Sequence, residues 1–295
     1  AGLKQGREVS GRLVGRGDQA ALEDILRVGT SAGGARAKAV LAWNARTGEF
    51  RSGQVNAGEG FSDWLLKFDG ISNNRDKELA DPQGFGLVEY GCYLLAVAAG
   101  IEMSESRLHH EGGRAHFMTR RFDRDVHGRK LHMQSLAAMR HFDFNAAGAY
   151  SYEQAVETIR QLELPMQDIE QQFKRAVLNV LLRNQDDHVK NIAFLMNQRG
   201  EWRLSPAFDV SYAYNPDGSW THQHQMSLQG KRDHFELDDL IGFGRFCGLK
   251  PAKAKRMIED IHGQVVQWMH FADQAGVPEA MAAKIDRSLR RELVS

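Results

Sequence analysis

The sequence contains very little cysteine and no excess of charge of either sign. Only two of its 295 residues are cysteines, Cys92 and Cys247, and both stand in apolar contexts without metal-ligand spacing. We expect both to be reduced core residues of a cytoplasmic protein, which argues against a disulfide scaffold. Lys plus Arg and Asp plus Glu both number 38. This balance gives no basis for direct binding to nucleic acid or to a membrane.

Long hydrophobic runs are also missing. No apolar stretch approaches the roughly 20 residues that span a bilayer, and no secretory signal is visible. The chain begins with Ala1 rather than methionine, so we expect a fragment or a trimmed chain. What is present is an ordinary globular composition, 42% hydrophobic and 26% charged. The length suits one large domain or two lobes that share a cleft.

The most informative stretch is residues 184–191, Asn-Gln-Asp-Asp-His-Val-Lys-Asn. It follows a helical pattern and precedes a predicted hairpin, and Asp209 lies beyond that hairpin. In protein-kinase-like enzymes a catalytic Asp precedes a metal-binding Asn by five residues, and a second metal-binding Asp follows the next hairpin. Asp186, Asn191 and Asp209 stand in these places. The alternative is a polar loop that caps a helix, where Asn and Asp are common.

Phosphoryl transfer needs a carboxylate to accept the proton of the attacking hydroxyl, and oxygen ligands to hold Mg²⁺ against the phosphates. The spacing therefore predicts Asp186 as the catalytic base, with Asn191 and Asp209 as metal ligands. We expect His188 to orient Asp186 or the backbone by hydrogen bonding. Lys190, in the same loop, completes the predicted catalytic set.

A glycine-rich stretch at residues 29–38 is a candidate phosphate-binding loop. Its backbone N–H groups, including those of Ser31, Ala32, Gly33 and Gly34, could approach phosphate oxygens closely. It is not a Walker A loop, because no Gly-Lys-Ser/Thr closes it. A plain turn is the alternative.

Lys67 lies within an apolar strand pattern at 64–68, where a buried ammonium group would need a partner. The functional interpretation is a lysine that contacts ATP phosphates and is held by Glu89, in a predicted helix at 88–99. The alternative is a solvent-facing lysine at a sheet edge. Other acids are also candidate partners: Asp69, Asp76 and Glu78.

The segment 116–124 resembles the hinge between two kinase lobes, whose backbone could bind adenine. We predict that Arg121, Phe122 and Asp123 belong to the ATP site. Asp123 could bind the ribose, and the alternative is a structural ion pair with Arg121 or Arg124.

In the second half of the chain, polar residues at 211–234 predict a long surface segment near the mouth of the cleft. His222 and His224 within it lack zinc spacing, so each is expected to be a satisfied or solvent-facing side chain. Helices are predicted at 131–140, 152–162, 168–183, from Pro251 with Met269 on its apolar face, and from Pro278 to the end.

Together these motifs resemble, in order, the HipA-like toxin kinases of bacterial toxin–antitoxin systems. The resemblance covers nearly the whole chain from about residue 25. It rests on residues 29–38, 65–68, 89–90, 121–124, 186–191 and 205–209. It implies an α+β, two-lobed protein-kinase-like fold, with a small mixed N-lobe containing an antiparallel sheet at 1–122 and a mainly helical C-lobe at 123–295.

The resemblance also implies an ATP- and Mg²⁺-dependent Ser/Thr protein kinase that autophosphorylates at Ser31. Such toxins arrest growth by phosphorylating a translation component, in known cases an aminoacyl-tRNA synthetase. A DNA-binding HipB-type antitoxin neutralises them, so contact with DNA is expected to be delegated to that partner. Only 28 residues precede Gly29 here, whereas family members usually carry a further small N-terminal subdomain. A separate small protein could supply that piece.

Two other functions compete with this interpretation. A small-molecule phosphotransferase of the antibiotic-kinase type shares the Asp, Asn, Asp pattern, and an acidic substrate pocket would support it. A pseudokinase that only binds nucleotide or a partner is the non-enzymatic alternative. The intact set of Lys67, Asp186, Asn191 and Asp209 argues against a pseudokinase.

Overall fold

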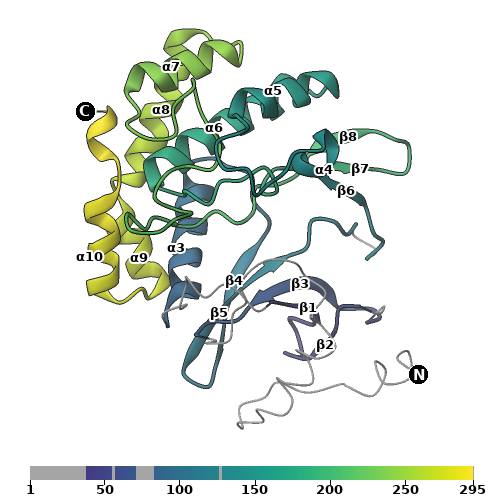
Figure 1. Ribbon diagram of the computed structural model, residues 1–295. Helices are drawn as coiled ribbons and strands as arrows, with labels where there is room; N and C mark the ends of the chain where they lie inside the picture. The colour runs from purple at the N-terminus through teal and green to yellow at the C-terminus, as the bar shows by residue number, and fades with distance from the viewer. Residues whose placement is uncertain (1–37, 55–56, 71–82, 126–127, 295) are drawn as a thin grey trace. The chain divides into compact units, whose positions relative to one another are not determined.

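The computed structural model describes residues 38–54, 57–70, 83–125 and 128–294. These residues form two compact units, shown in Figure 1. The first unit contains the described residues of 38–90 and 104–130, and the second contains those of 91–103 and 131–294. The predicted α+β class is confirmed, with an antiparallel sheet in the first unit and mainly helices in the second. The predicted lobes, 1–122 and 123–295, stay a prediction.

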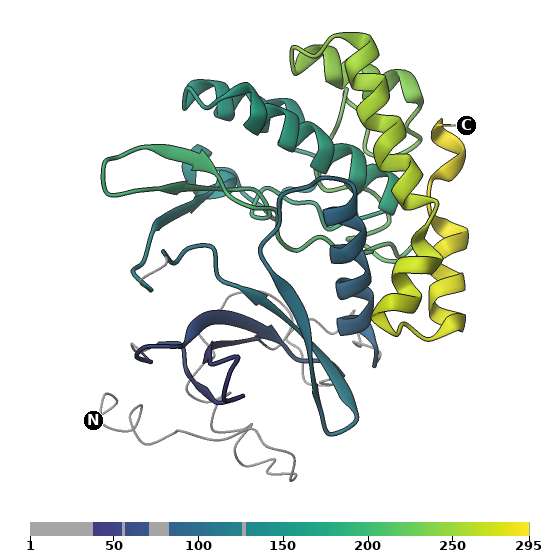
Figure 2. The ribbon, with the colours of Figure 1, turned by 180° about the vertical axis from the view of Figure 1, so that it is seen from behind.

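The first unit is built on a five-stranded antiparallel sheet with the strand order β2-β1-β3-β5-β4. Its strands are β1 (Lys38–Trp43), β2 (Phe50–Ser52), β3 (Ser62–Lys67), β4 (Ser106–Glu111) and β5 (Arg114–Arg120). Figure 2 shows β4 and β5 as a long hairpin. A buried cluster packs on the sheet: Ala39, Leu41, Phe50, Trp64, Leu66, Phe68 and Met118. Because β3 lies between β1 and β5, the alternative that Lys67 faces solvent from a sheet edge is wrong.

Helix α3 (Phe85–Ala98) begins three residues before the predicted start at residue 88. The carboxylate of Asp69 explains this, because it accepts hydrogen bonds from the N–H groups of Gly84 at 2.9 and 3.0 Å and of Gly86 at 3.2 Å. A carboxylate at the first turn satisfies donors that have no partner within the helix. The residue that caps this helix therefore lies just after strand β3.

The second unit contains the three-stranded sheet β6-β7-β8, formed by β6 (His132–Ser135), β7 (Ala193–Met196) and β8 (Trp202–Leu204). The helix predicted at 131–140 is therefore wrong in its first half. Residues 132–135 pair with β7, and the helix α4 spans only Leu136–Arg140. A pairing across about 60 residues of sequence leaves no local signal. Ser135 caps α4 by accepting a hydrogen bond from the N–H of Ala138 at 3.2 Å.

The remaining helices of this unit are α5 (Tyr152–Gln161), α6 (Met166–Leu182), α7 (Leu237–Phe246), α8 (Pro251–Val265), α9 (Trp268–Ala275), α10 (Glu279–Ser288) and the 3₁₀ turn η1 (Arg291–Val294). The central helix is α6, which packs against α5, α7 and α8. Its apolar face is fully buried, which is why the predicted helix at 168–183 is close to the observed one. Because α6 leads directly into residues 184–191, this packing fixes where that loop begins.

Two predictions about the C-terminal helices are wrong. The apolar pattern from Pro251 does not run through Met269 in one helix, because α8 ends at Val265 and α9 begins at Trp268. Met269, which was predicted to lie on the apolar face, is 39% exposed, and its neighbour Trp268 is the fully buried residue. The helix expected from Pro278 to the end stops at Ser288, because Leu289 is extended with ψ 144°.

Cys92 and Cys247 are buried thiols, as predicted. No helix among the described residues has the length and apolar character needed to cross a bilayer.

Candidate active site

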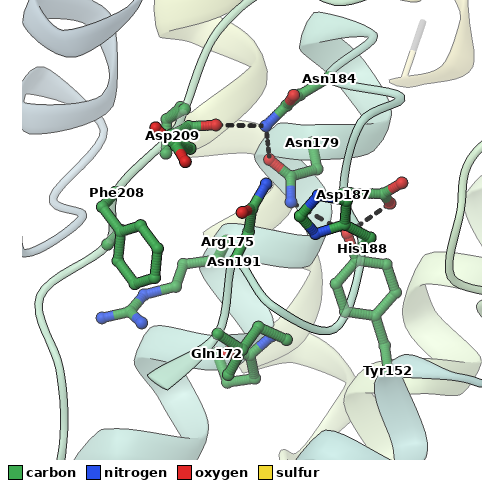
Figure 3. A pocket seen from close by; sticks show the side chains of 13 residues that line it. Tyr152, Gln172, Arg175, Asn179, Asn184, Asp187, His188, Asn191, Phe208 and Asp209 are labelled. Carbon is green, nitrogen blue, oxygen red and sulfur yellow. Dashed lines mark hydrogen bonds between the residues drawn. The ribbon is translucent and has the colours of Figure 1, made fainter. Parts of the chain in front are cut away.

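Residues 184–191, which we call the catalytic loop, follow α6 through a sharp change of backbone direction. Arg183 ends the helix with a left-handed backbone, φ 55°. Asn184 then donates from Nδ2 to Oδ1 of Asn179 at 2.9 Å and to the carbonyl of Asp209 at 3.3 Å, as Figure 3 shows. The loop is therefore tied at its start both to α6 and to the residue predicted to bind metal.

Asp186 presents its side chain, 47% exposed, from this loop. The indole N–H of Trp220 donates to Oδ1 of Asp186 at 2.7 Å. Partial burial, with Asp209 and Asp187 nearby, raises the pKa of Asp186 above its ordinary value of 3.8, against the opposing effects of His188 and the Trp220 hydrogen bond. A carboxylate with a raised pKa and an accessible oxygen can accept a proton from a bound hydroxyl.

His188 and Lys190 of this loop both lie beside the ring of Phe144. Nε2 of His188 is 3.9 Å from Oδ1 of Asp186, which is too long for a hydrogen bond. Among the described residues, the side chain that donates a hydrogen bond to Asp186 is therefore Trp220 and not His188. The Lys190 ammonium lies 3.4 Å from the centre of the Phe144 ring, a cation–π contact on the exposed side of the loop.

Asp187 is the residue that the sequence did not single out, although it stands next to the predicted base. Its side chain is 1% exposed, and its two oxygens accept hydrogen bonds from Tyr152 Oη, His224 Nδ1 and the Gln225 N–H, each at 2.7 Å. Burial would raise the pKa of Asp187, but these donors together hold it below its ordinary value. Asp187 therefore anchors the loop from inside, whereas Asp186 faces outward.

Asn191 and Asp209 line one pocket of the second unit together with residues of α6 (Figure 3). Nδ2 of Asn191 donates to the carbonyl of Asp186 at 2.9 Å, so its Oδ1 is the atom available to a ligand. Asp209 has a left-handed backbone with φ 52°, an uncommon conformation for a residue other than glycine that tends to occur at functional sites.

An amide oxygen and a carboxylate in one pocket suit Mg²⁺, which prefers oxygen ligands and takes few of them from the protein. The residues present therefore fit the metal that the sequence implies. Among the described residues, no group of three or more His, Cys, Asp or Glu side chains is placed to hold a metal ion.

The first unit pairs Lys67 with Glu89. The Lys67 ammonium is 9% exposed and the Glu89 carboxylate 4%, and Nζ of Lys67 donates to Oε1 of Glu89. Asp69, one of the other candidate partners, instead caps α3. The remaining two, Asp76 and Glu78, lie outside the described residues. A buried lysine held by a helix carboxylate is the arrangement that positions the nucleotide lysine of a kinase.

The predicted hinge contains an ion-pair cluster centred on Asp123. Arg121 binds Oδ1 of Asp123 at 2.8 Å and Oδ2 at 2.5 Å, and Arg124 binds Oδ2 at 2.7 Å. Burial opposes ionisation of Asp123, but the two arginines hold its pKa below the ordinary value. The structure thus contains the ion pair of Asp123 with Arg121 and Arg124, which was the alternative to a role of Asp123 in ribose binding. Phe122, which stands between Arg121 and Asp123 in the sequence, is half-buried.

The glycine-rich loop, with Ser31, Ala32, Gly33 and Gly34, lies outside the described residues. The polar segment 211–234 was expected at the surface, and this is wrong for its middle. His224 is 0% exposed and Gln225 3%, and both hydrogen-bond Asp187. His222, two residues earlier, is exposed. A local pattern could not distinguish the two histidines, because the partner of His224 is 37 residues away.

The family model that matches the chain is the HipA-like C-terminal domain, over residues 30–269. A search of curated proteins finds no match. Among solved structures, the chain is similar to HipA of the toxin–antitoxin system of Shewanella oneidensis MR-1, solved with HipB and its operator DNA, at 18% identity and a TM-score of 0.67. It is also similar to the Helicobacter pylori proinflammatory kinase CtkA, at 12% identity and a TM-score of 0.49.

The alignment with the S. oneidensis HipA covers 90% of this chain and 63% of that one, and the alignment with CtkA covers 79% and 89%. At these identities the likeness to HipA shows the fold. The chain spans less than two thirds of the length of that HipA.

Proposed function

The chain belongs to the family of HipA-like C-terminal domains, and from this membership and the site geometry we propose that it is an ATP- and Mg²⁺-dependent serine/threonine protein kinase. One observation carries the proposal. Asn191 and Asp209 line one pocket, and the amide of Asn191 bonds the backbone of Asp186, so the three residues predicted from spacing are gathered in the second unit.

In the proposed reaction, Asp186 accepts the proton of the attacking hydroxyl while that hydroxyl oxygen forms a bond to the γ-phosphorus of ATP and ADP leaves. Trp220 donates to Oδ1 of Asp186, so Oδ2 is the oxygen to which no described residue donates. The acceptor hydroxyl is therefore expected at Oδ2.

Asn191 and Asp209 would hold Mg²⁺, which when bound neutralises the charge of the phosphates. In the first unit, Lys67 would contact the phosphates. Its ion pair with Glu89 fixes the ammonium group, because a buried charge without its partner is strongly unfavourable. Lys190 lies at the exposed side of the loop, where a protein substrate would approach, whereas His188 lines the pocket.

We further propose that the kinase is the toxin of a toxin–antitoxin pair, that it phosphorylates a translation component, and that growth arrest and persistence follow. The structure of the S. oneidensis HipA contains HipB and operator DNA, which supports a HipB-type antitoxin as the partner here. A separate small protein equivalent to the N-terminal subdomain would be a second partner. Autophosphorylation at Ser31 would add about −1.5 to −2 charge to the glycine-rich loop and disfavour ATP binding there.

The test is incubation of the purified chain with labelled ATP and Mg²⁺, followed by mass spectrometry, for wild type, Asp186→Asn and Asp217→Asn. Asp217 lies exposed in the turn at 215–218, so its variant is the matched control. We expect phosphate on Ser31 in wild type and the control, with a loss of about 10²- to 10⁴-fold in Asp186→Asn and none transferred with EDTA.

Equal transfer in Asp186→Asn and wild type would rule out Asp186 as the base. Mg²⁺-dependent ATP binding without any transfer to protein would favour a small-molecule acceptor or a missing partner. No ATP binding at all would overturn the kinase proposal.

A further inference from the structure

A chain of buried hydrogen bonds connects the catalytic loop with Arg290, and His224 is its central member. Nδ1 of His224 lies 2.7 Å from Oδ2 of Asp187, and Nε2 lies 2.9 Å from Nη1 of Arg290. A guanidinium group only donates hydrogen bonds, so Nε2 must be the acceptor. The proton of the neutral ring is therefore on Nδ1 and is donated to Asp187. The surroundings thus select one tautomer of His224.

Arg290 is held in place by the end of α6, the helix that leads into the catalytic loop. Its Nη1 also donates to the carbonyl of Val180 at 2.9 Å, and its backbone N–H donates to that of Leu181 at 3.0 Å. Its Nη2 pairs with Asp233. Arg290 is 7% exposed, and it reaches the interior because α10 ends at Ser288 and the chain turns inward.

Asp187 receives the other end of this chain, and both of its oxygens are occupied. Besides His224, Oδ2 accepts from Tyr152 Oη, which is itself oriented by a hydrogen bond from Asn179 Nδ2 at 2.9 Å. Oδ1 accepts from the N–H of Gln225. Asp187 directly follows Asp186 in the chain. The hydrogen bonds that hold the Asp187 side chain in the interior therefore also fix the direction in which the Asp186 side chain points to the outside.

We propose that Arg290 is a positioning residue of the active site, acting through His224 on Asp187. We call Arg290, His224 and Asp187 the relay. Arg290 lies outside the residues that match the family model, 30–269. The consequence for catalysis rests on the proposed kinase function, whereas the relay itself is a property of the second unit that can be measured without activity.

Two substitutions at His224 separate the two bonds of the relay. His224→Asn places an amide N–H near the position of Nδ1 and keeps a donor for Asp187, but it loses the acceptor for Arg290. His224→Gln places its amide near Nε2 and keeps that acceptor, but it loses the donor for Asp187. We expect kcat to fall about tenfold in each, with KM for ATP unchanged. A tenfold change corresponds to about 1.4 kcal/mol, the size of one hydrogen bond.

The controls are His222→Asn and His222→Gln, at an exposed histidine of the same segment, which should keep the wild-type kcat. A purely structural role for His224 would lower the melting temperature and leave the kcat of the folded protein intact. Wild-type kcat in folded His224→Asn would therefore overturn the proposal.

Arg290→Lys tests whether Arg290 acts through His224. Alone it should lower kcat to a similar extent, whereas Arg287→Lys, at an exposed arginine of α10, should not. In the His224→Asn background, Arg290→Lys should cause no further loss, because the connection is already broken. A further loss in the double variant would show that Arg290 acts by another route and would overturn the relay.

Two measurements keep the proposal testable if wild type transfers no phosphate, and the first of them needs wild type alone, so it also serves if the variants do not fold. In wild type, long-range ¹H–¹⁵N spectra of the histidine rings should show His224 with a proton on Nδ1 only; a proton on Nε2 would overturn the relay. Amide hydrogen exchange at 185–190 should be faster in His224→Asn than in His222→Asn, and equal rates would overturn it. Failure of phosphoryl transfer alone would count against the kinase proposal only.

Discussion

His116 lies in β5 with 3% of its surface exposed, and its Nδ1 accepts a hydrogen bond from the N–H of Asp69 at 2.9 Å. Burial, with His109 nearby, lowers the pKa of His116 from 6.5 to about 4. Between these two values the unfolded chain binds a proton that the folded chain does not. Stability is therefore complete above pH 6.5 and is lost as pH falls toward 4. Protonation would also remove the acceptor that orients Asp69, the residue that caps α3.

We predict that acidification from pH 7 to 4.5 costs wild type about 2–3 kcal/mol through His116, since each unit of pKa shift corresponds to about 1.4 kcal/mol. In His116→Asn, whose side-chain oxygen can replace Nδ1 as acceptor, this part of the pH dependence should disappear. His110→Asn, at an exposed histidine of β4, should keep it. Urea unfolding at a series of pH values measures the difference, and parallel curves for wild type and His116→Asn would contradict the prediction.

Helix α3 approaches strand β5 closely at Gly86. A Cβ atom at this position would lie 2.2 Å from the carbonyl oxygen of Ala115, a distance that no side chain tolerates without a backbone shift. Gly263, in the last turn of α8, is the opposite case, because a Cβ there would meet nothing within 4 Å. The two glycines therefore differ in what an added methyl group does to the element that contains them.

We predict that Gly86→Ala destabilises the protein by about 1–3 kcal/mol, as overpacking does. Gly263→Ala should stabilise it by up to about 1 kcal/mol, because alanine favours a helix over glycine. The shift of the urea midpoint at constant slope measures both effects. A stabilising Gly86→Ala would mean that α3 can move away from β5 at little cost.

The sequence predicted those elements whose determinants are local. The apolar face of α6 and the spacing of Asp186, Asn191 and Asp209 could be recognised because each depends on residues within one helix or one motif. The strand β6 could not, because only its pairing with β7 makes it a strand.

For the site residues, too, local patterns could be recognised in the sequence, whereas contacts between distant segments could not. The buried side chains that support the catalytic loop, such as His224, stand in polar stretches that resemble surface loops. The burial of His224 depends on two partners that are distant in the sequence. Asp187 is 37 residues away and Arg290 is 66 residues away. Propensity and periodicity contain no information about such pairs.

For the whole molecule, the equal numbers of acidic and basic residues bear on DNA binding. Non-specific DNA binding depends on neutralisation of phosphates by Lys and Arg and has a Kd of about 10⁻⁴–10⁻⁶ M for proteins that bind DNA. We predict that the isolated chain binds a mixed-sequence duplex more weakly than this range at physiological salt. Fluorescence anisotropy between 50 and 200 mM salt measures it. A submicromolar Kd with a steep salt dependence would show a basic surface that overall composition conceals.

The position of Arg290 also has a consequence for the time at which activity appears during synthesis. The ribosome makes Asp186 and the rest of the catalytic loop well before residue 290, so a growing chain contains the proposed base before the Arg290 contact that we propose orients it. A chain that has not yet reached residue 290 would therefore have residues 184–191 loosely held. For an enzyme proposed to phosphorylate a translation component, this order of synthesis would leave the proposed base without its support until residue 290 has been made.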